Sequence, residues 1–122
     1  MWGLNQLNTE ESLLTALGFH VGSEILADQE FNLLDEFLRT KYPTVVNHLK
    51  GKKLPSGTNA YNWLEQHTYV EIEHFDNALL AVEKTLQYYA GTRSVAQVRA
   101  IIFDGFLQFA VLQRRFFDII LD

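Results

Sequence analysis

Cysteine is absent from the sequence, and residues that interrupt regular structure are few, with two prolines and seven glycines among 122 residues. Without cysteine the chain forms no disulfide and offers no thiolate, which is typical of proteins in a reducing compartment. We therefore expect a cytoplasmic protein. The scarcity of proline and glycine leaves room for long helices.

The sequence also has little that would direct it to a membrane or to nucleic acid. Met1 to Glu11 holds no basic region followed by an apolar run, so no signal peptide is predicted there. The most apolar stretch, Ala100 to Leu112, is interrupted by Asp104 and Gln108 and falls short of the roughly 20 apolar residues that span a bilayer. A net charge of -5 gives no electrostatic attraction for nucleic acid. We expect neither partner.

The composition is that of a soluble globular protein, with 48% apolar and 20% charged residues. A chain of this length forms one domain at most, which we place at residues 1–122, and buries about two thirds of its unfolded surface. Nine phenylalanines suggest an apolar interior or pocket. No strand-like alternation and no internal repeat is found, so the predicted class is an all-α helical bundle.

Hydrophobic periodicity predicts three long helices and one short one. The first is capped by Thr9 and runs to about Thr40, and the short one covers Thr44 to Leu49. The third is capped by Thr58 or Asn59 and ends at Gly91. The last opens with the capping box Ser94-x-x-Gln97 and continues to about Leu121.

The first predicted helix is apolar on two sides, which is typical of a helix buried between neighbours. One face includes Leu17 and Phe31. The second strip consists of Phe19, Leu26, Leu33 and Phe37. Gly18 and Gly22 share one side, and they predict either close helix packing or the approach of backbone to a ligand.

The most informative stretch is His67-x-x-x-Glu71-x-x-His74 in the third predicted helix. Spacings of four and three place the three side chains on successive turns of one face, which is otherwise apolar. An unpartnered buried charge costs several kcal/mol, so such groups are normally paired, neutralised or bound to a metal. Two imidazoles and one carboxylate form a partial ligand set for iron, manganese or zinc.

Glu24 on the first helix is the predicted fourth ligand, because it lies among apolar residues and would face the histidines from a neighbouring helix. Two other interpretations of the cluster stay open, namely a buried hydrogen-bonded network and a wet groove between helices. His20, on the same face as Glu24, is expected to be a core histidine, although a ligand or base role is also open. His48 is expected to be exposed.

Three further acidic residues could assist the cluster. Asp28 and Asp35 continue the side of the helix that carries Glu24, and both are expected nearer solvent. Asp104 lines up with other polar residues of the last helix, so a solvent-facing stripe is favoured over a metal-binding role. The sequence contains no nucleophile elbow, no phosphate-binding glycine loop and no His-Glu-x-x-His zinc motif.

The His67-x-x-x-Glu71-x-x-His74 helix, preceded by the segment Gly18 to Ala27, resembles the second half of the haem-oxygenase-like di-iron oxidases, and among them the CADD-like proteins. The resemblance implies half of an all-α haem-oxygenase-like fold that holds two non-haem irons, or iron and manganese, and no haem. The ligands that it implies are Glu24, His67, Glu71 and His74. The family more often has Asp at the position of Glu71.

Members of that family are about twice as long, and their first core helix, which supplies a Glu and a His, has no counterpart here. The chain offers two histidines and two carboxylates, whereas a di-iron site usually has two histidines and three or four carboxylates. We therefore expect the missing half to come from a second copy in a dimer or from a longer protein.

The resemblance implies an oxygen-activating oxidoreductase, with an apolar small molecule as a candidate substrate. The alternative is a non-catalytic helical interaction module, a degenerate half-domain that dimerises. A third interpretation, haem binding with His20 as axial ligand, has no other residue in its favour.

Overall fold

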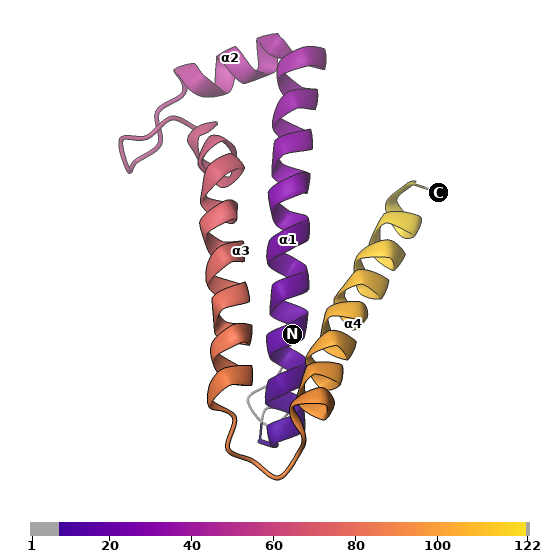
Figure 1. Cartoon of the computed structure of the whole chain (residues 1–122). Coiled ribbons are helices and arrows are strands. Elements are labelled where there is room, and N and C mark those ends of the chain that lie inside the picture. The colour runs from indigo at the N-terminus through magenta and orange to yellow at the C-terminus, as the bar shows by residue number, and fades with distance from the viewer. Residues whose placement is uncertain (1–7, 122) are drawn as a thin grey trace. The chain divides into compact units, whose positions relative to one another are not determined.

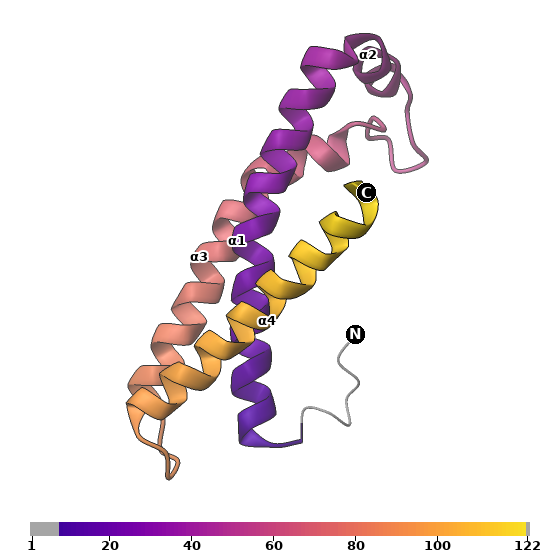
Figure 2. The same ribbon diagram turned by 90° about the vertical axis from the view of Figure 1, so that its right-hand side faces the viewer.

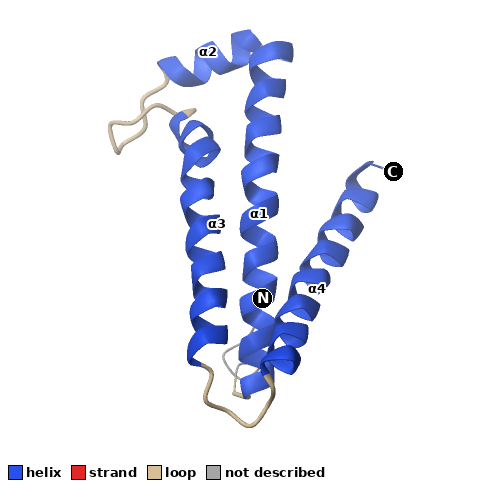
Figure 3. Ribbon diagram, in the orientation of Figure 1, coloured by secondary structure: helices blue, strands red, loops and turns tan. Residues whose placement is uncertain are grey.

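The computed structural model of the chain describes residues 8–121, and this part contains four helices and no strand. Helix α1 spans Glu10–Lys41, α2 spans Pro43–Gly51, α3 spans Asn62–Tyr88 and α4 spans Val95–Leu121. Figure 1 labels the helices, and Figure 3 shows the loops that join α2 to α3 and α3 to α4. The predicted all-α class, with three long helices and one short one, is confirmed. Residues 1–7 lie outside the described residues. They belong to the segment Met1 to Glu11, in which no signal peptide is predicted.

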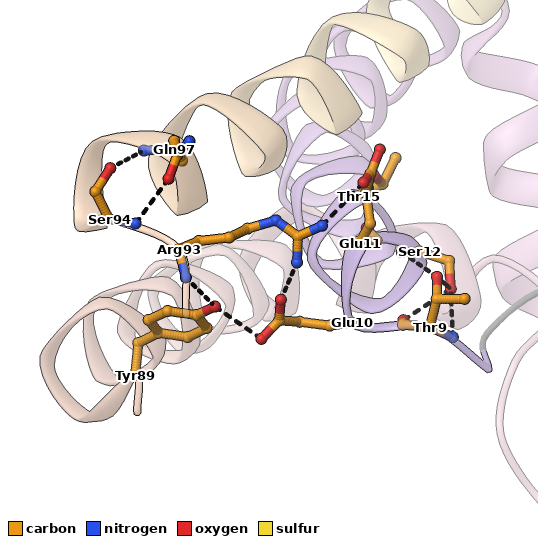
Figure 4. Close-up of polar contacts among 9 residues, drawn as sticks. All are labelled: Thr9, Glu10, Glu11, Ser12, Thr15, Tyr89, Arg93, Ser94 and Gln97. Carbon is orange, nitrogen blue, oxygen red and sulfur yellow. Dashed lines mark hydrogen bonds and ion pairs between the residues drawn. The ribbon is translucent and has the colours of Figure 1, made fainter. Parts of the chain in front are cut away.

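The predicted starts of α1 and α4 are confirmed by their hydrogen bonds (Figure 4). The Ser12 amide donates to the Thr9 hydroxyl at 3.1 Å, which satisfies one of the free N–H groups in the first turn of α1. At the start of α4, the Ser94 amide donates to Oε1 of Gln97 at 2.8 Å, and the Gln97 amide donates to Oγ of Ser94 at 3.2 Å. These two bonds make the reciprocal capping box.

Helix α3 is shorter at both ends than the sequence predicts. Asn59 forms an isolated bridge with Lys53, and its side-chain oxygen accepts a hydrogen bond from the Tyr61 amide at 3.0 Å. This turn takes the chain out of helical geometry until Asn62. At the other end α3 stops at Tyr88, so the predicted end at Gly91 is wrong by three residues.

The helices belong to two compact units, which are described separately. The first comprises Met1–Glu24 and Asp76–Asp122, and we call it the α4 unit. The second comprises Ile25–Phe75, and we call it the α2 unit. Helices α1 and α3 each contribute one part to each unit.

The α4 unit is held together by a close crossing of α1 and α4 (Figure 2). A Cβ added to Gly18 would overlap the carbonyl oxygen of Ile102, and one added to Gly105 would overlap the carbonyl oxygen of Thr15. The two backbones can therefore approach only because these positions carry no side chain. The prediction of close packing at Gly18 and Gly22 is confirmed. The core beside the crossing consists of Leu14, Val98 and Ile102.

A polar cluster ties the α3–α4 loop to the first turn of α1 (Figure 4). Glu10 accepts a hydrogen bond from the Tyr89 hydroxyl at 2.8 Å and forms an ion pair with Arg93. Arg93 also pairs with Glu11 at 3.1 Å. Two carboxylates in the first turn of α1 also favour the helix through its dipole.

The second half of α4 carries an apolar face that other described residues do not cover. Val98 and Ile102 are buried, whereas Phe116 and Ile120, which continue the same face, are exposed. By length and composition α4 could cross a membrane, and 17% of its most apolar window is buried. The whole helix passes this test although Ala100 to Leu112 alone falls short of it. A core helix of a soluble protein passes the same test.

The α2 unit packs around Val46, Tyr61 and Leu64, with Phe31, Leu38 and Leu49 partly buried against them. The second apolar strip of α1 is not covered in this unit, because Leu33 and Phe37 are exposed. The prediction that α1 is buried on two sides is therefore wrong for this part of the helix. Phe19, in the α4 unit, packs as expected, with its ring 5.1 Å from that of Phe109, and Leu26 is half-buried.

Candidate metal centre

The candidate centre lies on the part of α3 that belongs to the α2 unit. The side chains of His67, Glu71 and His74 are 26%, 7% and 50% exposed. Glu71 is the only charged residue that is buried among those described. The inward face predicted for α3 is confirmed at Leu64, Glu71 and Ala78, which are all buried.

The two oxygens of Glu71 face different imidazoles. Oε1 lies 3.8 Å from Nε2 of His67, and Oε2 lies 3.4 Å from Nδ1 of His74. Two ligand atoms that each lie about 2.1 Å from one metal can be at most about 4.2 Å apart. Each pair of atoms is therefore close enough to share an ion. Glu71 and His74 belong to a group of side chains that could hold a metal ion.

The His67 ring is oriented by its neighbours. Its Nδ1 lies 2.6 Å from the carbonyl oxygen of Trp63. In the tautomer that donates this hydrogen bond, Nε2 carries a lone pair on the side of Glu71, which is the usual arrangement for a metal-binding histidine. The ring centroid lies 4.1 Å from that of Trp63 and 4.9 Å from that of Phe31. Packing and hydrogen bonding therefore hold the ring in a ligating orientation.

His74 is half exposed, although the sequence predicts that all three side chains face inward. A residue three positions after Glu71 is rotated by about 300° round the helix, so its side chain points about 60° away from the direction of the buried Glu71. This rotation places His74 on the flank of α3. It still lies within 3.4 Å of Glu71, so the expected pairing is kept.

Glu24 is the predicted ligand from the first helix, and it lies in the α4 unit. Its carboxylate is mostly buried and lies 3.4 Å from Nδ1 of His20. His20 is exposed, so the expectation of a core histidine is wrong. It sits one turn before Glu24 on the flank of α1, where a polar ring can reach solvent.

The remaining predicted residues lie outside the α3 cluster. His48 is exposed, as expected. Asp104 is exposed and accepts a hydrogen bond from Gln108 at 2.8 Å, which confirms the solvent-facing stripe. Asp28 is half-buried and accepts a hydrogen bond from Asn32. Asp35 is also half-buried, and its side chain is 19% exposed, against 16% for Glu24.

Asp35 belongs to an ion-pair network that sequence reasoning missed. The buried Tyr61 donates to Oδ1 of Asp35 at 2.7 Å, and Arg39 bonds the same carboxylate at 2.9 Å. Glu65 pairs with Arg39 at 3.0 Å and with Lys50 at 3.1 Å. The one signal in the sequence is the i, i+4 spacing of Asp35 and Arg39. The partners Tyr61 and Glu65 are distant in the sequence.

The network shifts the pKa values of Tyr61, Asp35, Glu65 and Arg39, and it raises that of Arg39 chiefly through the hydrogen bond to Asp35. Burial and the hydrogen bond to Asp35 raise the pKa of Tyr61 to about 12. Burial by itself would raise the pKa of Asp35, but the hydrogen bonds from Tyr61 and Arg39 outweigh it and hold that pKa below its ordinary value. Hydrogen bonds from Lys50 and Arg39 lower the pKa of Glu65.

An apolar cavity of about 270 Å³ lies within the α4 unit. Helix α1 contributes Gly18 and Val21 to its wall, and α4 contributes Phe103 and Phe106. The sequence predicts an apolar interior or pocket from its nine phenylalanines, and two of them, Phe103 and Phe106, line this cavity. Arg99 is its one charged lining residue.

Comparison with known proteins finds no matching family model, no matching curated protein and no matching solved structure.

Proposed function

We propose that the chain is a non-haem, oxygen-activating oxidoreductase of the haem-oxygenase-like di-iron type, with iron, or iron and manganese, as its metal. The proposed ligands are Glu24, His67, Glu71 and His74. The observation that carries the proposal is the burial of Glu71 between two imidazoles. No lysine or arginine among residues 8–121 forms an ion pair with this carboxylate. A buried carboxylate of this kind is stabilised best by a cation.

The donor set is compatible with iron or manganese, as it is with zinc. Neutral imidazoles and carboxylates suit these metals, and the sequence has no thiolate that would select a softer ion. When bound, iron would supply the binding and activation of O2. The chain's own residues would hold the metal, and the Trp63 carbonyl would keep Nε2 of His67 free to ligate it.

The apolar cavity of the α4 unit supports an apolar small molecule as substrate. The residues described in its wall include no acidic one, and its volume of about 270 Å³ is just below the roughly 300 Å³ at which ordinary small-ligand pockets begin. The absence of cysteine supports a cytoplasmic location.

Metal uptake by protein purified without chelator tests the proposal. We expect Fe(II), added without oxygen, to raise the Tm, because an ion at 100 times its Kd stabilises the folded state by about 2.7 kcal/mol. His67→Ala and His74→Ala should each lose most of this shift. His48→Ala, which changes an exposed histidine away from the cluster, is the matched control. Equal shifts in all variants would contradict the site.

Admission of oxygen to the Fe(II)-loaded chain tests the redox part separately. We expect an O2-dependent absorbance change that depends on His67 and His74. A chain that binds Fe(II) but shows no response to O2 would keep the metal site and contradict the oxidase.

The uncovered apolar face of α4 favours a second candidate, a non-catalytic helical interaction module. Phe116 and Ile120 are large and exposed on that face, and contiguous exposed apolar residues mark interaction surfaces. This candidate predicts no metal uptake and an unchanged Tm in Fe(II) or Mn(II).

A further inference from the structure

We infer that the metal centre is completed by a second copy of this chain, in a dimer that joins the flanks of α3 carrying Trp63, His67 and His74. The inference rests on the proposed function and names the partner of the same site. It follows from the ligands that one chain offers, from the geometry of Glu71 and from the surface beside the histidines.

One chain offers half of a dinuclear ligand set. In dinuclear carboxylate centres of four-helix bundles, two helices each supply a Glu, and the other two each supply a Glu-x-x-His motif. This chain has one of each, Glu24 and Glu71-x-x-His74. A second copy related by a two-fold axis doubles both and completes the set. His67 would add one further nitrogen to each half.

The geometry of Glu71 suits a carboxylate that serves two ions. Its two oxygens lie near the nitrogens of two different histidines, at 3.8 Å and 3.4 Å. A carboxylate placed in this way can bridge two metals, with one imidazole at each. A pair of metals needs more carboxylate ligands than the two that one chain supplies. The partner's Glu24 and Glu71 would supply the others.

The flank of α3 beside the histidines has the character of an interface centre. Trp63 is 59% exposed although its ring lies against His67, and exposed tryptophans of this kind are enriched among residues that dominate binding. Trp63, His67, Val70 and His74 follow the alternating spacing of four and three that forms a seam between paired helices.

The same seam can face itself across a two-fold axis. None of its four members is a lysine, arginine or carboxylate. In an isologous dimer each residue meets the same patch of the other copy. Like-charge repulsion between the seam residues is therefore avoided, and bound metal offsets the charge of the Glu24 and Glu71 carboxylates that the two copies bring together.

Mn(II) added to the full chain gives the first test, read by sedimentation equilibrium and by electron paramagnetic resonance. We expect a species of twice the 14.1 kDa chain mass, with one Mn(II) per chain and an exchange-coupled spectrum from neighbouring ions. A 14.1 kDa chain that carries Mn(II) with an uncoupled six-line spectrum would overturn the dimer and leave the proposed metal site intact. No uptake of Mn(II) or Fe(II) would overturn the proposed function, and the shared centre with it.

Two aromatic variants give a matched comparison. Trp63 and Tyr69 are 59% and 58% exposed on the same helix, but they are six residues apart and so point in directions about 120° apart. We expect Trp63→Ala to weaken the Mn(II)-dependent dimer about 10-fold or more and Tyr69→Ala to leave it unchanged. Equal effects of the two variants would overturn the assigned surface.

A charged variant at Val70 tests the dimer without removing the contact between the Trp63 and His67 rings. Val70→Glu leaves Trp63 and His67 in place and sets two carboxylates against each other at the axis, so the chain should stay monomeric in Mn(II) with an unchanged circular dichroism spectrum. Ile120→Glu, on the uncovered face of α4, should still dimerise. A dimer that survives Val70→Glu but is lost in Ile120→Glu would place the interface on α4 and overturn the inference. Partition of the chain into phosphatidylcholine vesicles in place of dimerisation would also overturn it.

Discussion

At the scale of single residues, Glu71 connects the fold to the proposed chemistry. Its position on the inner face of α3 follows from helical spacing, which is why the sequence predicts it. Burial of its carboxylate beside two imidazoles costs stability when no cation is bound and favours the folded chain when one is. A metal ligand of this type therefore lowers the free energy of unfolding of the metal-free protein.

Glu71→Gln should therefore have opposite effects with and without metal. Without metal we expect an unchanged or higher Tm, because the amide keeps the shape and removes the buried charge. With saturating Mn(II) we expect the variant to lose most of the metal-dependent rise in Tm. Glu73→Gln, in an exposed neighbour, is the control. A variant that loses stability equally under both conditions would point to a structural carboxylate.

Tyr61→Phe tests the network of the α2 unit. The variant loses a hydrogen bond to a charged carboxylate, so we expect a loss of about 2 kcal/mol in the free energy of unfolding at pH 7. Urea unfolding at fixed pH measures it. Tyr69→Phe, in an exposed tyrosine, should be neutral. A loss below about 0.5 kcal/mol for Tyr61→Phe would contradict the network.

The same network predicts how the stability of the α2 unit depends on pH. The pKa values of Asp35 and Glu65 are lowered in the folded chain from ordinary values of 3.8 and 4.5. Their stabilising contribution is present above these values and is lost as the pH falls through the lower folded pKa values. The pKa of Tyr61 is raised from 10.0 to about 12. Its contribution is present below pH 10 and is lost as the pH rises toward 12.

Residue roles could be predicted where the interacting partners are close in the sequence. The Thr9 cap and the Ser94–Gln97 box each involve residues three positions apart. The bond between Tyr61 and Asp35 joins residues 26 positions apart. No helical period relates these positions, so the pair could not be found before the helices were placed.

At the scale of helices, the crossing of α1 and α4 depends on Gly18 and Gly105, each of which lies against the backbone of the other helix. The sequence predicts tight packing from the spacing of Gly18 and Gly22, because glycine inside a helix costs about 1 kcal/mol and needs a compensating reason. Gly105 lies among apolar residues of α4, and its role became visible only with the partner helix beside it.

A graded series of alanine variants should report this crossing. Gly18→Ala and Gly105→Ala place Cβ against backbone carbonyl groups, which cannot move aside, so we expect losses of about 3 kcal/mol or failure to fold. Gly22→Ala meets the side chain of Phe109 at 3.0 Å, and a gain in helix propensity of about 1 kcal/mol offsets part of the strain. Gly51→Ala, with open space around it, should be nearly neutral. Thermal unfolding of the series would contradict the crossing if all four variants behaved alike.

At the scale of the whole chain, the sequence predicted the helices better than their surroundings. Helix existence follows from local periodicity, and all four helices were found. The solvent exposure of a side chain depends on which other elements cover its helix face, and local periodicity gives no information about those elements. Leu33, Phe37 and Ile120 are exposed for this reason, although they fall on apolar strips.

The uncovered face of α4 should act separately from the metal centre. We expect Ile120→Glu to raise the solubility of the metal-free chain, because it places a charge in an exposed apolar face. The same variant should keep the full Mn(II)-dependent rise in Tm. Light scattering and thermal unfolding measure the two effects, and a common loss of both would link α4 to the metal centre.

The contact between the Trp63 and His67 rings gives the chain an intrinsic optical sensor. Their centroids lie 4.1 Å apart, so a paramagnetic ion bound to the imidazole would sit close enough to quench the indole emission. With Trp2 replaced by Phe, the fluorescence of the remaining indole would follow ion occupancy in real time, without a label and without any assumption about what the protein oxidises.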